Sequence, residues 1–276
     1  MKSQNPELDA RQPGIRQPGT RQSGAMPSVS DRLPGPYPVI QGGLAVDAAS
    51  EARLNHALAA MGLADDQVHG PRLLAYLHHL QRWNRTYNLT AIRDPAQMLV
   101  QHLFDSLAVL PTLRELAMQR AQRALKIADV GSGAGLPGII IALCEPRWTV
   151  VCIDAVGKKT AFMRQVAGLL GLTNVQVQQG RIESMPSVQA DIVISRAFAS
   201  LADFVRLAAH HCNPDGLMLA MKGQDLPAER EDLLQHTDWH VARAIGLQVP
   251  ELAAQRCLLQ LAPNATGTEP MRPCDA

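Results

Sequence analysis

The sequence feature that most constrains the fold is a glycine-rich turn between a short apolar run and an apolar helix. The run LKIADV (125–130) leads into GSGAGLPG (131–138) and then into IIIALC (139–144). Glycine lets the backbone turn sharply and approach a ligand closely, which a side chain at Gly131, Gly133 or Gly135 would obstruct. The helix that follows offers free amide N–H donors at its start. The segment is therefore typical of a loop that binds a nucleotide or nucleoside.

This string fits two kinds of nucleoside-binding loop. Starting at Gly133, it satisfies the dinucleotide pattern G-x-G-x-x-G through Gly135 and Gly138. In that pattern the first glycine follows the strand almost at once, whereas Gly133 comes three residues after Val130. An acidic residue, Asp129, also precedes the first glycine of the string, Gly131, and this register resembles that of the first methyltransferase motif. We expect Asp129 to organise the loop or face a methionine ammonium, with a loop-capping aspartate as the alternative.

A second acidic residue follows at the spacing expected for a ribose contact. Asp154 ends the next apolar run, TVVCID, 23 residues after Gly131. Its two oxygens can accept both hydroxyls of an adenosine ribose. The alternative is an N-cap for the helix that begins near Gly157, and the two roles can coexist.

Short apolar runs alternate with helical stretches after residue 123. The predicted strands are LKIADV (125–130), TVVCID (149–154), VQVQQ (175–179), DIVIS (191–195), LMLAMK (217–222), Val241 to Val249 and Arg256 to Leu261. The predicted helices run from Leu136 to Cys144, from Lys158 to Leu170 and from Leu201 to His211. Such alternation predicts an α/β, Rossmann-like fold: a mostly parallel seven-stranded sheet with helices on both faces. The last two strands, with no clear helix between them, predict an antiparallel edge.

We divide the chain into a leader (1–45), a helical cap (46–124), the sheet domain (125–264) and a flexible tail (265–276). The leader holds the near-repeat RQPGI RQPGT RQSG, cannot bury apolar area and is predicted to be disordered. In the cap, apolar residues recur at helical spacing through Leu54 and Leu58 and again through Leu73 and Leu77. A third helix is predicted over Gln97 to Leu110, with Pro95 near its start.

The whole-chain composition excludes several classes of protein. The net charge of +1 means that any basic surface must be local. No apolar run reaches the length of a membrane helix and the first 25 residues contain no secretory signal, so we expect a cytoplasmic protein without a membrane contact. The five cysteines form no C-x-x-C pair and the nine histidines no H-E-x-x-H motif, so we expect no metal site.

Basic residues follow almost every predicted parallel strand. They are Lys158, Lys159, Arg181, Arg196 and Lys222. Because ligands of such sheets bind beyond the carboxyl ends of the strands, these charges are predicted to converge and to attract a polyanion such as RNA. The alternative for any one of them is a surface ion pair, for example with Asp191, Glu183 or Glu145.

The segment after the fourth strand limits the choice of methyl acceptor. Exocyclic amines are usually held by an N-P-P-Y-like string, and this chain has Ser195-Arg196-Ala197-Phe198 instead. Pyrimidine carbon requires a cysteine nucleophile, commonly after proline, and the one Pro-Cys string lies in the tail. An acceptor that is already nucleophilic remains, such as ring nitrogen 7 of guanine, for which no general base is needed. Arg196 is the predicted catalytic residue and would hold the guanine together with Phe198, for which a core position is the alternative.

Several strings of the chain together resemble the ribosomal small-subunit methyltransferase G family, also called glucose-inhibited division protein B. The matching strings are RWNRTYNLTAIRDPAQMLVQHLFDSL, DVGSGAGLPG, DAVGKKTAFMRQV, VISRAFASL and the MKGQ turn, which together cover roughly residues 50–262. The resemblance implies a class I methyltransferase that uses S-adenosylmethionine to methylate guanine nitrogen 7 in the decoding region of 16S ribosomal RNA. The chain departs from the family in its long leader and in Ser132 and Ala134 of the loop.

The resemblance also implies roles for individual positions. Gly131 and Leu136 would line the cofactor pocket, Ile182 and Glu183 would flank the adenine, and Arg196 would contact the cofactor or the methyl site. The basic positions Lys158, Arg181 and Lys222 would serve RNA binding.

Two other functions remain open at this stage. One is an NAD(P)-dependent oxidoreductase, which uses similar glycines and a similar acid. The other is a noncatalytic RNA-binding protein of ribosome assembly. For the methyltransferase we expect a monomer whose partner is 16S RNA in the small ribosomal subunit or an assembly intermediate.

Overall fold

The computed structural model describes residues 47–65, 68–121, 124–196 and 198–264. The described residues belong to one compact unit. The predicted leader (1–45) and tail (265–276) lie outside these ranges.

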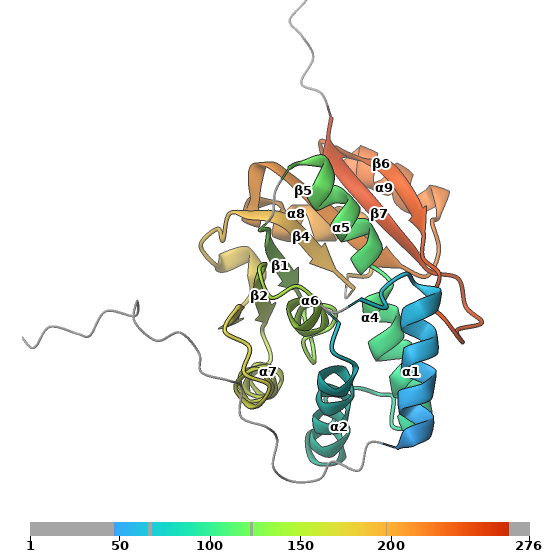
Figure 1. Cartoon of the computed structure of the whole chain (residues 1–276). Helices are drawn as coiled ribbons and strands as arrows, with labels where there is room; N and C mark the ends of the chain where they lie inside the picture. Colours follow the sequence, from blue (N-terminus) through green and yellow to red (C-terminus); the bar gives the residue numbers. More distant parts are fainter. Residues whose placement is uncertain (1–46, 66–67, 122–123, 197, 265–276) are drawn as a thin grey trace, which may run out of the picture. The chain divides into compact units, whose positions relative to one another are not determined.

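Seven strands form one sheet in the order β3-β2-β1-β4-β5-β7-β6 (Figure 1). They are β1 (Lys126–Val130), β2 (Thr149–Asp154), β3 (Val175–Gln179), β4 (Ala190–Ser195), β5 (Cys212–Lys222), β6 (Trp239–Gly246) and β7 (Cys257–Pro263). The first five strands pair in parallel, whereas β7 is antiparallel to both β5 and β6. The predicted α/β fold, with its antiparallel closing pair, is confirmed.

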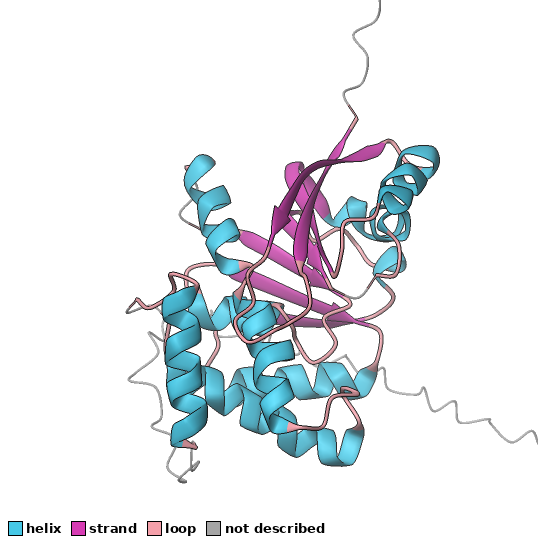
Figure 2. Ribbon diagram, turned by 90° about the vertical axis from the view of Figure 1, so that its right-hand side faces the viewer, coloured by secondary structure: helices cyan, strands magenta, loops and turns pink. Residues whose placement is uncertain are grey.

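Helices cover both faces of the sheet, as predicted (Figure 2). On one face lie α6 (Gly138–Cys144) and α7 (Gly157–Leu169), and on the other lie α8 (Leu201–Ala208) and α9 (Pro227–His236). Successive strand residues point to opposite faces, so Ile127 of β1 packs in the first core and Ala128 in the second. Because both faces are covered, the central strands are continuous apolar runs rather than alternating ones.

The N-terminal helices pack onto the same face as α6 and α7. They are α1 (Ala48–Ala60), α2 (Gly70–Tyr87), α3 (Pro95–Met98), the π-helix η1 (Leu99–Phe104), α4 (Asp105–Leu107) and α5 (Leu110–Gln119). Their apolar residues share one continuous core with those of the sheet. The buried Tyr76 of α2 adds a polar tie, because its hydroxyl donates to the carbonyl oxygen of Ala134 in the glycine loop at 2.7 Å.

Several elements differ from the sequence prediction. The single helix expected over Gln97 to Leu110 begins at Pro95 and contains six π-helical residues. The helices α5 and α9 were missed; α9 buries only Leu233, so its sequence lacks an apolar stripe. Between β3 and β4, where no helix was predicted, the chain forms only a short 3₁₀ turn, η2 (Ile182–Ser184). The strand expected over 217–222 begins earlier, at Cys212, beyond an irregularity in its pairing with β4.

Gly135→Ala should destabilise the fold by about 2 to 5 kcal/mol. The residue has φ +84, and an added Cβ would lie 2.4 Å from Cγ1 of Ile139, so backbone strain and overpacking would combine. Gly62→Ala is the matched control, because Gly62 also has a positive φ (+68) but has open space around an added Cβ. Gly62→Ala should lower the free energy of unfolding by only about 1 kcal/mol. Urea unfolding monitored by circular dichroism measures both, and equal losses would contradict the steric argument.

Candidate functional site

The glycine loop between β1 and α6 is tied to the end of β2. The amides of Gly131 and Ser132 both donate to the carbonyl oxygen of Ile153, at 2.9 and 3.1 Å. The Ser132 hydroxyl donates to the carbonyl oxygen of Asp129 at 2.7 Å and accepts from the amide of Ile153 at 3.1 Å. The three glycines of the GSGAG string all have positive φ, a conformation that favours glycine.

Asp129 organises this loop from inside the protein. Its Oδ2 accepts a hydrogen bond from the amide of Gly138 at 2.9 Å, at the first residue of α6. The carboxyl is fully buried, and burial raises its pKa to about 6. The organising role therefore fits the geometry, and the buried Oδ1 has no hydrogen-bond partner among the described residues.

Asp154 holds the same loop from the end of β2. Its Oδ2 accepts from the amide of Gly133 at 2.9 Å, and its Oδ1 accepts from the amide of Val156 at 2.8 Å. The alternative role as N-cap of α7 is wrong, because Val156 occupies that position and no side chain caps the helix. Lys159 lies nearby, with its Nζ 3.7 Å from Oδ2 of Asp154.

A cavity of about 220 Å³ opens over the loop. It is lined by Leu89, Thr90, His102, Gly131, Ser132, Gly133, Ala134, Leu136 and Arg196. A Cβ added at Gly133 would meet nothing nearer than the carbonyl oxygen of Gly131 at 4.0 Å, so this glycine keeps the cavity open. Gly135 is not part of the lining, because it packs against Ile139 of α6 instead. The fold alone already requires glycine here, because φ is +84 and an added Cβ would meet Ile139.

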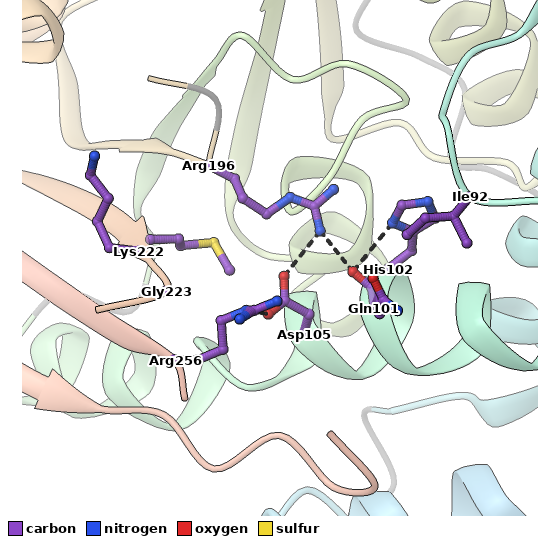
Figure 3. Close-up of a pocket in the computed structure, with 9 residues that line it drawn as sticks. Ile92, Gln101, His102, Asp105, Arg196, Lys222, Gly223 and Arg256 are labelled. Atoms are coloured by element: carbon purple, nitrogen blue, oxygen red, sulfur yellow. Dashed lines mark hydrogen bonds and ion pairs between the residues drawn. The ribbon is translucent and has the colours of Figure 1, made fainter. Parts of the chain in front are cut away.

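A second cavity, of about 360 Å³, adjoins the first (Figure 3). It is lined by Ile92, Gln101, His102, Asp105, Arg196, Met221, Lys222, Gly223 and Arg256. Arg196 and His102 belong to the walls of both cavities. A ligand in one cavity would therefore lie beside a ligand in the other.

Arg196 is anchored on the N-terminal helices. Its Nη1 donates to the carbonyl oxygen of Gln101 at 3.1 Å and to Oδ2 of Asp105 at 3.0 Å. The π-helical segment supplies Gln101 and His102, and π-segments frequently occur at functional sites. Burial, followed by the charge of Arg196, lowers the pKa of His102 to about 4, so this imidazole is neutral at pH 7. Its Nε2 lies 2.9 Å from Oγ1 of Thr90.

The structure does not bring the five predicted basic residues into one cavity. Lys158 donates to the carbonyl oxygen of Tyr87 at 2.8 Å, while Arg181 is 80% exposed and lies 3.8 Å from the carboxylate of Glu183. Lys222 has the least exposed side chain of the five basic residues. Its Nζ contacts Glu229 at 2.9 Å and donates to the carbonyl oxygen of Ala199 at 2.8 Å. These contacts favour a structural role for Lys222 over the predicted RNA contact, although the residue also lines the second cavity.

The remaining predicted residues do not line the two cavities. Ile182 and Glu183 form the turn η2 one strand away from Asp154, and neither is among the residues that line the two cavities described above. Phe198 packs against Phe204 with ring centroids 5.3 Å apart, which fits the alternative of a core position.

Sequence reasoning missed three ionisable side chains of the second cavity. They are His102, Asp105 and Arg256, of which the first two lie in the family-like string QHLFDSL. No sequence pattern marked Arg256 as a site residue, because its segment is typical only of the start of an edge strand.

The family model described as "rRNA small subunit methyltransferase G" matches residues 70–259, more than half of the chain. The chain belongs to the rRNA small subunit methyltransferase G family. This confirms the resemblance found in the sequence. A relative of that name from Bordetella avium is 52% identical over 213 residues, which cover 77% of this chain and 93% of the relative. Another, from Ralstonia nicotianae, is 46% identical over 219 residues, which cover 79% of this chain and 97% of the relative.

Solved structures similar to this member of the rRNA small subunit methyltransferase G family include a ribosomal protein L11 methylase from Lactobacillus delbrueckii subsp. bulgaricus. That chain is 19% identical, with a TM-score of 0.43, over 56% of this chain and 78% of its own length. A SAM-dependent methyltransferase from Aquifex aeolicus is 16% identical, with a TM-score of 0.40, over 53% of this chain and 88% of its own.

Two further findings concern the described part of this family member. None of its helices is long and apolar enough to cross a membrane. Within the same residues, no group of three or more His, Cys, Asp or Glu side chains is arranged to hold a metal ion.

The different surroundings of Lys222 and Arg181 predict different effects of their removal. Lys222→Ala should lower the free energy of unfolding by about 1 to 3 kcal/mol, because it leaves the partly buried Glu229 unpaired. Arg181→Ala should leave stability unchanged and reduce the salt slope of RNA binding by about 1. Urea unfolding and fluorescence anisotropy with small-subunit RNA at several salt concentrations test both. A reduced slope with intact stability for Lys222→Ala would restore its predicted RNA contact.

Proposed function

We propose that this chain transfers the methyl group of S-adenosylmethionine to ring nitrogen 7 of a guanine in the decoding region of 16S ribosomal RNA. The main observation in support of methyl transfer is the pair of adjoining cavities that share Arg196 and His102 in their walls. The names of the relatives, each a ribosomal RNA small subunit methyltransferase G, support the substrate.

The cavity over the glycine loop fits the cofactor. Gly131, Gly133 and Leu136 form its wall, and Gly133 leaves the space that a side chain would fill. In this proposal Asp154, at the edge of the loop, accepts the ribose hydroxyls while its oxygens keep the loop amides in place. Ile182 and Glu183 would flank the adenine one strand further along the sheet. When bound, the cofactor supplies an electrophilic methyl group.

The second cavity fits an acceptor that loses no proton. Guanine nitrogen 7 attacks with an in-plane lone pair, so the site needs orientation and charge stabilisation and no general base. The carboxylate of Asp105 is not available as a base, because both of its oxygens accept hydrogen bonds from arginines. Arg196 stands between the two cavities and would hold the base against the methyl group.

Basic residues at the sheet edge would bind the RNA around this site. We place Lys158, Lys159 and Arg181 in that role, because all three follow parallel strands at the edge where the glycine loop lies. The partner would be the small ribosomal subunit or an assembly intermediate, bound by a monomer. A ribosomal RNA substrate would place the enzyme in the cytoplasm, where subunits are assembled.

The direct test is a mapped methylation assay. Purified protein, labelled S-adenosylmethionine and small subunits that lack the modification should give label in 16S RNA, at nitrogen 7 of one guanine. Incorporation at another atom would overturn the acceptor, and none into subunits or naked RNA would favour a noncatalytic RNA-binding protein. Calorimetry adds the remaining control, since tight binding of NAD(H) in place of S-adenosylhomocysteine would favour an oxidoreductase.

Asp154→Ala should weaken binding of S-adenosylhomocysteine by about 1 to 3 kcal/mol, measured by calorimetry. The loss has two sources, the ribose hydroxyls and the support of the Gly133 amide. Asp203→Ala is the matched control, because this exposed aspartate of α8 pairs with Arg206 away from either cavity. An unchanged affinity for Asp154→Ala would remove this residue from the cofactor site.

A further inference from the structure

A buried carboxylate joins two arginines in the wall of the second cavity. Asp105 is 2% exposed, its Oδ2 accepts from Nη1 of Arg196 at 3.0 Å, and its Oδ1 accepts from Nε of Arg256 at 2.9 Å. Figure 3 shows the carboxylate between the two guanidinium groups. Asp105 begins α4, Arg196 follows β4 and Arg256 directly precedes β7, so three distant segments meet at one carboxylate.

The contact with Asp105 fixes the direction of the Arg256 guanidinium. Its Nε is held by Asp105, and its Nη1 donates to the carbonyl oxygen of Gln255 at 2.9 Å. Among the described residues, no hydrogen-bond acceptor meets its Nη2, and the residue lines the second cavity. The two N–H groups of Nη2, on a guanidinium held at Nε and Nη1, are therefore left for a ligand.

We propose that Arg256 recognises oxygen 6 of the target guanine and that Asp105 positions it for this contact. The proposal rests on the function proposed above, nitrogen 7 methylation. Nitrogen 7 is common to both purines, so an enzyme that methylates it must distinguish them by another atom. The neighbouring group is a carbonyl acceptor in guanine and an amino donor in adenine. A fixed N–H donor beside the methyl site accepts the first and rejects the second.

The surroundings favour a base over a phosphate as the ligand of Arg256. Asp105 neutralises one of the two positive charges, which leaves a site better matched to a polarised carbonyl than to a phosphate. Ile92 and Met221 add apolar contacts for a planar ring. The cavity also adjoins the glycine loop through Arg196, so its occupant lies where the acceptor must be.

The experiment removes the hydrogen-bond donor, Arg256, and the hydrogen-bond acceptor, oxygen 6 of the base, first separately and then together. Wild-type protein and Arg256→Gln are assayed on small subunits reconstituted with guanine or 2-aminopurine at the target position. 2-Aminopurine keeps nitrogen 7 and the 2-amino group but lacks oxygen 6. Each single change should lower kcat/KM by about 10- to 100-fold, and the double change should cost no more than either alone. Losses that multiply would overturn the contact.

Controls separate this contact from other roles of Arg256. The affinity for S-adenosylhomocysteine should be unchanged, and Arg206→Gln on α8 should behave as wild type on both bases. If Arg256→Gln weakened RNA binding equally for both bases and lowered the salt slope by about 1, the residue would contact phosphate and the proposal would fail. Wild-type protein inactive on guanine would overturn the proposed function instead.

Asp105→Asn tests the positioning role. The variant should lower kcat/KM more on guanine than on 2-aminopurine, because the oxygen 6 contact depends on the direction of Arg256, whereas loss of the Arg196 anchor affects both bases. Equal losses on both bases would indicate a general structural role for Asp105. The Arg256 variants decide the main proposal even where Asp105→Asn folds poorly.

Discussion

The site depends on two carboxylates that bind the backbone of the glycine loop from adjacent parallel strands. Asp129 in β1 holds the amide of Gly138, and Asp154 at the end of β2 holds the amide of Gly133. Backbone amides that turn toward the interior need such acceptors, because an unpaired buried N–H is costly. The loop, the start of α6 and the cavity above the loop all follow from these two contacts. The cost is a buried carboxyl at Asp129 whose pKa is raised to about 6.

The elements that the sequence predicted correctly are those determined by residues close together in the sequence. The glycine turn was evident because Gly131 and Gly133 require positive φ, and β1 and β2 because strands covered on both faces are continuous apolar runs. The π-helical residues 99–104 were missed, because their apolar spacing is also that of an ordinary helix. The short helix α9 was missed because its sequence has no apolar face.

The sequence predicted only part of the site. Strand order determines at which edge of the sheet a residue lies, but it does not determine what the side chain contacts there. Lys222 does end β5, but Glu229 and two carbonyl oxygens occupy its ammonium group. Gly135 belongs to the glycine pattern, yet its requirement for glycine comes from Ile139 of α6. Arg256 and Asp105 are 151 residues apart in sequence and meet only in the folded chain, so no local pattern could pair them.

The position of Arg256 has a consequence for how the protein is made. Chains fold from the N-terminus as they leave the ribosome, and β7 is the last strand of the described chain. A nascent chain that ends after β5 already carries the glycine loop and the carboxylates that hold it, but it lacks one wall of the second cavity. During translation, the residues that we propose for the methyl donor therefore leave the ribosome before the residue that we propose for selection of the base.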